Sequence, residues 1–141
     1  MPKRVTTRRA RWLEKPKAHP AHQQRSYQAV GQQDEETRFE VYQRQNLGDE
    51  QDFSCGIVYL PPGSSPLTLA RYNGPSHVHG DIDYRPHIHR ASERAMAAGR
   101  KPETDAEETK RFTTLEGALA CLIDDFRLNG LDAQPDEPRL L

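Results

Sequence analysis

One continuous apolar stripe near the C-terminus constrains the fold more than any other feature of this chain. Thr113 is followed three residues later by Glu116, which is the pattern of a helix-capping box, and Asn129-Gly130 provides a stop signal. A helix with a single apolar stripe has to cover another apolar surface. We therefore predict a helix over about residues 114–129, packed on a sheet. Its stripe has the spacing i, i+3, i+4, i+7, i+8 and i+11, and consists of Leu115, Ala118, Leu119, Leu122, Ile123 and Phe126.

Short β-prone runs joined by turn residues precede this helix. They cover residues 26–31, 37–45, 53–60, 66–72 and 85–91, and Asn73-Gly74 is a strong local turn signal. Strands joined by short polar turns favour antiparallel pairing between neighbours. The predicted fold class is α+β: an antiparallel β-meander of about four to five strands covered by the C-terminal α-helix.

Length and charge predict one domain with a basic N-terminal extension. A chain of 141 residues has room for one core, and its 34% hydrophobic content indicates that part of the chain lies in tails or long loops. Residues 1–17 contain seven Lys or Arg residues and one Glu. We predict a basic, flexible arm over residues 1–24, a single α+β domain over 25–131 and a C-terminal tail over 132–141.

Three further observations bear on location. Cys55 and Cys121 are the only cysteines and form no Cys-x-x-Cys motif, which favours two buried free thiols in a reducing cytosol. No segment approaches the ~20 apolar residues of a membrane span. Arg8-Arg9 is followed by Lys15-Pro16-Lys17 and not by an apolar run, which excludes a twin-arginine export signal. The predicted location is the cytoplasm, without a membrane partner.

Four of the six histidines lie in residues 71–90, as two His-x-His pairs. Because side chains alternate along a strand, His77 shares one face with His79, and His87 shares one face with His89. Gly80 and Pro86 can turn the intervening chain back, which would bring the two pairs face to face.

Three interpretations of this histidine cluster stay open. The first is structural, with imidazoles hydrogen-bonded to water or backbone. The second is a metal site, for instance for Zn²⁺, with His77, His79, His87, His89 and Asp81 or Asp83 as ligands. His77-Val-His79-Gly-Asp-Ile-Asp83 matches a fragment of the cupin pattern, although cupins carry Glu there and a second motif that is absent here. The third is metal-free acid–base chemistry beside Arg71, Arg85 or Arg90.

The order of motifs in this region resembles the TumE-type toxins of bacterial toxin–antitoxin modules. The matching residues are Arg71-Tyr72-Asn73-Gly74-Pro75-Ser76-His77, then Pro86-His87-Ile88-His89, then a terminal helix, over about residues 67–130. The resemblance implies a compact α+β toxin that acts on RNA and has an antitoxin partner. It also implies that the functional positions of the family correspond to Arg71, Tyr72, His77, His87 and His89. The basic arm and an insertion at about 92–110 depart from the family pattern.

Metal-independent RNA cleavage fits these residue types chemically. His87 or His89 would act as base and His77 or His79 as acid, while Arg71 and Arg90 would stabilise the phosphorane. Tyr72 or Tyr84 would stack on a base, and Arg85 would contact substrate. No cofactor is then required.

Two alternative functions remain. One is a non-catalytic interaction or defence-associated binding protein, whose histidines are structural or bind Zn²⁺. The other is a metal-dependent hydrolase or cupin-like enzyme. In either case the basic arm, Lys3–Lys17, is a candidate contact for nucleic acid or a protein partner.

Overall fold

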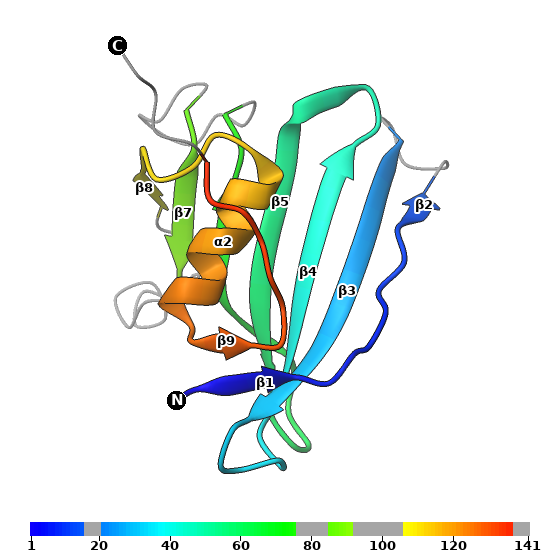
Figure 1. Ribbon diagram of the computed structural model, residues 1–141, viewed down its shortest axis with the longest axis vertical. Coiled ribbons are helices and arrows are strands. Elements are labelled where there is room, and N and C mark those ends of the chain that lie inside the picture. The colour runs from blue at the N-terminus through cyan, green and yellow to red at the C-terminus, as the bar shows by residue number, and fades with distance from the viewer. Residues whose placement is uncertain (16–20, 76–84, 92–105, 137–141) are drawn as a thin grey trace.

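A computed structural model describes residues 1–15, 21–75, 85–91 and 106–136. The described residues form one nine-stranded sheet and helix α2 (Leu115–Asp125), which lies on one face of the curled sheet (Figure 1). The strands are β1 (Lys3–Val5), β2 (Leu13–Lys15), β3 (His22–Gly31), β4 (Arg38–Asn46), β5 (Asp49–Leu60), β6 (Leu67–Asn73), β7 (His87–Arg90), β8 (Ala106–Glu108) and β9 (Leu128–Asn129).

The sheet is mixed. Its strand order is β8-β7-β6-β5-β4-β3-β1-β9, with β2 paired to β3 beside this path. Strands β3 to β8 pair antiparallel with their neighbours in sequence, and β1 is antiparallel to β3. By contrast, β9 is parallel to β1, with Lys3 opposite Leu128. The first and last strands in sequence, β1 and β9, therefore meet at one edge of the sheet.

The fold class predicted from the sequence is wrong. The sequence predicts an antiparallel meander of four to five strands, whereas the protein is mostly β, with one curled mixed sheet of eight to nine strands and a single short helix among the described residues. The five predicted strand runs overlap β3, β4, β5, β6 and β7. The missing strands are two to three residues long. Strands of that length leave no alternating pattern to read.

Helix α2 lies where its apolar stripe predicts it, but both predicted ends are shifted. The N-cap is Thr114 and not Thr113: its extended backbone (φ −119°, ψ 160°) precedes the helix and its side chain accepts a hydrogen bond from Gly117 N. The helix ends at Asp125, before the predicted Asn129-Gly130 stop. Arg127 turns the chain with φ 51°, and Leu128 then enters the sheet.

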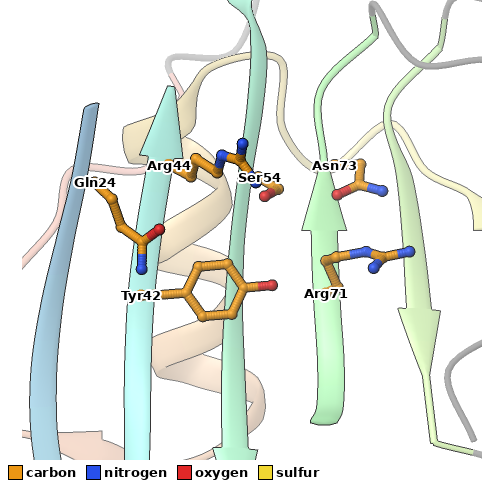
Figure 2. Close-up of a pocket in the computed structure, with 6 residues that line it drawn as sticks. All are labelled: Gln24, Tyr42, Arg44, Ser54, Arg71 and Asn73. Atoms are coloured by element: carbon orange, nitrogen blue, oxygen red, sulfur yellow. The ribbon is translucent and has the colours of Figure 1, made fainter. Parts of the chain in front are cut away.

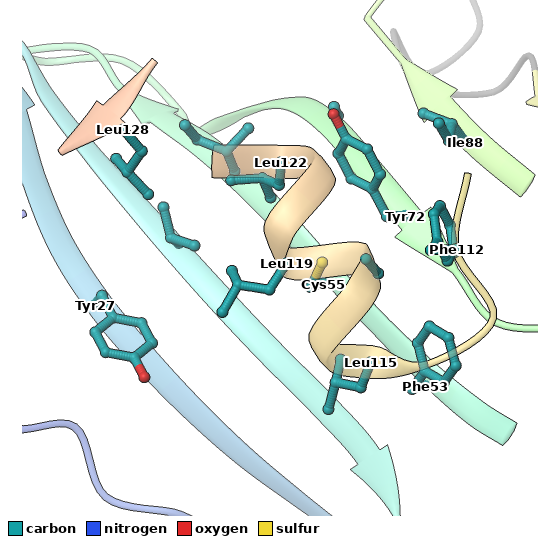
Figure 3. Packing of buried hydrophobic residues seen from close by; sticks show 14 of the residues in the cluster. Tyr27, Phe53, Cys55, Tyr72, Ile88, Phe112, Leu115, Leu119, Leu122 and Leu128 are labelled. Atoms are coloured by element: carbon teal, nitrogen blue, oxygen red, sulfur yellow. The ribbon is translucent and has the colours of Figure 1, made fainter. Parts of the chain in front are cut away.

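The core lies between α2 and the face of the sheet that it covers (Figure 3). Leu115, Leu119 and Leu122 of the helix pack on Val41, Cys55 and Tyr72 of the central strands. Phe112 joins them through tilted ring contacts with Phe53 and Tyr72, at centroid distances of 6.2 and 6.0 Å. Burying apolar area of this kind is the main stabilising contribution to a fold.

The segment predicted as an arm contributes strands to the sheet. Strands β1 and β2 both pair with β3. In the β2 pairing, Leu13 lies opposite Gln24 and Lys15 lies opposite His22. Lys3 is buried, and its Nζ donates to the carbonyls of Met1 (2.7 Å) and Phe126 (3.2 Å). Burial, with Arg127 nearby, lowers the pKa of this ammonium. One of the basic side chains of residues 1–15, that of Lys3, therefore lies inside the fold and not on its surface.

Candidate functional site

The central strands have two chemically different faces. On β6, Ala70 and Tyr72 point to the core, while Arg71 and Asn73 point to the face opposite α2. The register extends this second face across the sheet, because Asn73 lies opposite Ser54 and Arg71 lies opposite Gly56. We call this surface the polar face. Its described members include Gln24, Tyr42, Arg44, Ser54, Arg71, Asn73, His87 and His89.

A pocket of about 470 Å³ opens on the polar face (Figure 2). Two guanidinium groups, one phenol, one hydroxyl and two amides line it, and no carboxylate is among these lining residues. Such a surface attracts anions and offers both hydrogen-bond donors and acceptors. We call it the polar pocket. It is lined by Gln24, Tyr42, Arg44, Ser54, Arg71 and Asn73.

Two buried polar atoms of this pocket, Arg71 Nε and Asn73 Oδ1, have no hydrogen-bond partner among the described residues. Asn73 is 5% exposed. Leaving such atoms unpaired costs about 1–3 kcal/mol each, and proteins rarely accept that cost without a structural or functional reason. The two residues are neighbours on one face of β6 and face the same side of the sheet. Together they mark a place where a ligand would complete the hydrogen bonding.

The imidazoles of β7 lie beside this pair. In the antiparallel register, His87 is opposite Asn73 and His89 is opposite Arg71. The two rings are in edge-to-face contact, with centroids 5.1 Å apart, and each side chain is 1% exposed. His87 Nδ1 lies 3.1 Å from the Arg85 carbonyl, and Asn73 Nδ2 lies 3.3 Å from His87 Nε2.

The structure brings together part of the predicted site. Arg71, His87 and His89 are adjacent on the polar face. Arg85 and Arg90 are exposed and form ion pairs at 3.1 Å with the carboxylates of β8, Glu108 and Glu107 respectively. These two arginines therefore make contacts with the neighbouring strand and do not line the polar pocket. Predicted site residues His77, His79, Asp83 and Tyr84, together with Asp81, lie outside the described residues.

Tyr72 is a correction to the predicted site. Its side chain is 0% exposed and points to the core, so it is not available to stack on a base. Its hydroxyl donates to Asp125 Oδ2 at 2.6 Å, and Arg111 holds the same carboxylate through two hydrogen bonds of 2.9 and 2.8 Å. Burial and the Asp125 contact raise the pKa of Tyr72. Burial alone would raise the pKa of Asp125, but the bonds from Arg111 and Tyr72 outweigh it and lower that pKa.

Sequence reasoning named Arg71 and missed the other five pocket residues, among them Asn73 on β6. Tyr42 and Arg44 alternate on β4, while Gln24 and Ser54 come from the strands on either side. The available signal was alternation, because Tyr42 sits between the buried residues Val41 and Gln43, and exposed Arg44 follows Gln43. That signal places side chains on a face, but it does not tell which strands are neighbours.

In the described part of the chain, no three or more His, Cys, Asp or Glu residues are grouped so that they would hold a metal ion. The one helix described there, α2, is not long and apolar enough to cross a membrane. Comparison of the chain with protein-family models, curated proteins and solved structures finds no match. A functional assignment therefore depends on the chemistry of the polar face.

Proposed function

We propose that the protein binds single-stranded RNA on the polar face and cleaves it without a metal ion. The observation that carries this proposal is the juxtaposition of unpaired Arg71 Nε with the His87–His89 pair. Cationic donors next to imidazoles are the groups that phosphodiester transesterification requires. The residues of the polar pocket supply the contacts that hold the strand.

Binding follows from charge and hydrogen-bond chemistry. Phosphate oxygens are acceptors with negative charge, and guanidinium groups are their best-matched donors. Arg44 is exposed, whereas Arg71, which lines the same pocket, is half-buried. Two phosphates of one strand, or one phosphate shared by both side chains, would be neutralised here. We expect affinity to fall as salt concentration rises.

The proposed cleavage step balances without a cofactor. The 2′-oxygen attacks the neighbouring phosphorus, the bond from phosphorus to the 5′-oxygen breaks, and the products are a 2′,3′-cyclic phosphate and a 5′-hydroxyl. We assign the proton acceptor to His89, because it lies opposite Arg71 in the register. Protonation of the leaving 5′-oxygen is assigned to His77 or His79, as the sequence predicts. Arg71 would stabilise the charge on the phosphorane.

Burial of the imidazoles sets a condition on this proposal. His87 and His89 are each 1% exposed, so the substrate has to open the surface above them before proton transfer. Binding at Arg44 needs no such change, because that side chain is already exposed. Binding and cleavage are therefore separable steps, and each has its own measurement.

The same burial favours a second candidate function, a non-catalytic interaction protein in which the histidines are structural. The contacts of His87 fit such a role, because its two ring nitrogens lie within hydrogen-bond distance of the Arg85 carbonyl and the Asn73 amide. The predicted antitoxin-like partner and the cytoplasmic location belong to either candidate and stay predictions.

The test uses labelled mixed-sequence RNA in parallel reactions with and without EDTA. Four proteins are compared: wild type, Arg71→Gln, His89→Asn and the control Arg127→Gln. Arg127 is exposed at the turn between α2 and β9 and does not line the polar pocket. Its substitution therefore removes one positive charge from the protein without changing the pocket. Binding is measured by fluorescence anisotropy, cleavage on gels and folding by thermal melting.

We expect wild-type and Arg127→Gln proteins to cleave RNA in EDTA and leave cyclic phosphate ends. His89→Asn should still bind and lose about 10²–10⁴-fold in cleavage rate at an unchanged melting temperature. Arg71→Gln should lose both binding and cleavage. Binding without cleavage by the wild type, combined with a lower melting temperature of His89→Asn, would favour the interaction protein. Equal binding by wild type and Arg71→Gln would overturn the site.

A further inference from the structure

We propose that Asn73 makes the polar pocket specific for ribose, by accepting a hydrogen bond from a 2′-hydroxyl of the bound strand. This inference rests on the proposed RNA binding and adds the residue that distinguishes RNA from DNA. It starts from the buried acceptor atom Asn73 Oδ1, which has no partner in the part of the chain that the structure describes. Arg71, two residues earlier on the same face of β6, supplies the neighbouring contact to phosphate.

The orientation of the Asn73 amide follows from a chain of hydrogen bonds. The Arg85 carbonyl only accepts, so the hydrogen of neutral His87 is on Nδ1, 3.1 Å away. Nε2 of the same ring is then an acceptor, and Asn73 Nδ2 donates to it at 3.3 Å. The amide oxygen must consequently point away from β7. Figure 2 shows Asn73 with its nitrogen toward β7 and its oxygen toward Ser54.

The place of this oxygen limits the ligand groups that satisfy it. Asn73 lines the polar pocket and is 5% exposed, which means that a ligand filling the pocket removes the remaining water. Phosphate diesters carry no hydrogen to donate, and deoxyribose has no hydroxyl at the 2′-position. A ribose 2′-hydroxyl has one, and it is the group by which a protein tells RNA from DNA at a given site.

The hydroxyl in question is not the one that attacks. A hydroxyl has a single proton, and in the proposed cleavage that proton goes to His89. Residues Arg71 and Asn73 are separated along β6 by about 7 Å, which is two steps of a strand. This separation fits a phosphate at Arg71 and a neighbouring ribose at Asn73. Asn73 is therefore a specificity residue for a nucleotide adjacent to the cleaved bond.

The test is a series of oligonucleotides of one sequence that differ only at the 2′-position. The members carry 2′-amino, 2′-deoxy or 2′-O-methyl groups, and none has a 2′-hydroxyl that could attack. Only the 2′-amino group can donate a hydrogen bond. We expect the wild-type protein to bind the 2′-amino strand about tenfold more tightly than the other two. Equal affinity for all three would overturn the role of Asn73 and leave RNA binding intact.

Substitution of the protein provides the matched test. Asn73→Leu keeps a similar size without polar atoms, and should reduce affinity for the 2′-amino strand to that for the 2′-deoxy strand, which itself should not change. Arg127→Gln is the control, because Arg127 is exposed and does not line the polar pocket. It should keep the tenfold ratio. Loss of the ratio in Arg127→Gln with its retention in Asn73→Leu would overturn the assignment.

Failure of the proposed function has a different signature. If the wild-type protein binds neither these strands nor the labelled RNA of the first test, RNA binding itself is excluded. The series is repeated with a second base sequence: if affinity follows the base sequence and not the 2′-group, a base amine is the donor and the ribose assignment is wrong. Should Asn73→Leu fail to fold, the three strands still decide the question with the wild-type protein.

Discussion

The ring of Tyr42 lies directly on Gly56, its partner across the β4–β5 ladder. A Cβ atom at residue 56 would come within 2.7 Å of Cε1, Cζ and the hydroxyl oxygen of Tyr42. The absence of a side chain at Gly56 therefore lets the phenol cross β5 toward β6 (Figure 2). Because Arg71 is the partner of Gly56 on the other side, the phenol and guanidinium lie in one row of the sheet.

This relationship predicts a coupling between two substitutions. Gly56→Ala should destabilise the protein by about 1–3 kcal/mol, since the added methyl group has to displace the Tyr42 ring. In a Tyr42→Ala background the same change should cost much less. Urea unfolding of the two single variants and the double variant measures the coupling. Gly48→Ala is the control, because its nearest neighbour would be Asn46 Oδ1 at 3.5 Å, an ordinary contact. An equal cost of Gly56→Ala in both backgrounds would contradict the overlap.

A second prediction concerns acid stability. The pKa of Asp125 is lower in the folded protein than in the unfolded chain, despite burial, because Arg111 and Tyr72 bond the charged form. The unfolded chain then binds more protons in the acid range, so this contribution is complete above about pH 4 and is lost as pH falls through the folded pKa. Asp125→Asn should cost most at neutral pH and progressively less in acid.

The measurement is urea unfolding of wild type and Asp125→Asn at neutral and acid pH. Asp124→Asn, an exposed neighbour at the end of the same helix, is the control. Tyr72→Phe should also lose about 1–2 kcal/mol at neutral pH, because it removes the buried hydroxyl donor and leaves Asp125 with Arg111. A cost of Asp125→Asn that grows in acid would contradict a lowered pKa of Asp125 in the folded protein.

A third prediction concerns the two thiols. Cys55 is fully buried, and burial together with the nearby Cys121 raises its pKa, so it is neither accessible nor ionised at neutral pH. Cys121 is half-buried. Native protein treated with a thiol reagent should react at Cys121 first, and at Cys55 only at the rate of unfolding. Peptide mapping after timed labelling distinguishes them, and early labelling of Cys55 would contradict its burial.

Local patterns predicted the central elements of this fold. Alternation and turn residues placed runs that overlap β3 to β7, and the apolar stripe placed α2. The edge of the sheet was not predictable in the same way. Strand β9 has two residues and pairs with β1 at the opposite end of the chain, and a contact of that sequence separation leaves no local signal.

The site shows the same division. Side chains alternate along a strand, so the sequence already predicts that the consecutive residues Arg71 and Tyr72 point to opposite faces of the sheet. The two side chains therefore could not line the same binding surface. It also allows Arg71 and Asn73 to share a face. Asn73, Ser54 and Arg44 are neighbours only because of the pairing register of three strands. Turn residues fix such a register only in part.

The start of α2 and the segment after β9 are joined by one carboxylate. Asp136 accepts hydrogen bonds from the backbone N–H and hydroxyl groups of both Thr113 and Thr114. Burial would raise the pKa of Asp136, but these bonds, led by that from Thr114, outweigh it and lower the pKa. The same carboxylate occupies the space where a Cβ of Gly117 would lie.

The position of Asp136 predicts that one substitution changes sign with its background. Replacing a helical glycine by alanine normally stabilises a protein by about 1 kcal/mol. Here Gly117→Ala should destabilise the wild type, because the new methyl group displaces Asp136 from Thr113 and Thr114. In an Asp136→Ala background the same change should be stabilising. Thermal melting of the four proteins measures the sign, with Asp132→Ala as an exposed control that should leave Gly117→Ala destabilising. Stabilisation by Gly117→Ala in both backgrounds would show that Asp136 does not cap the helix.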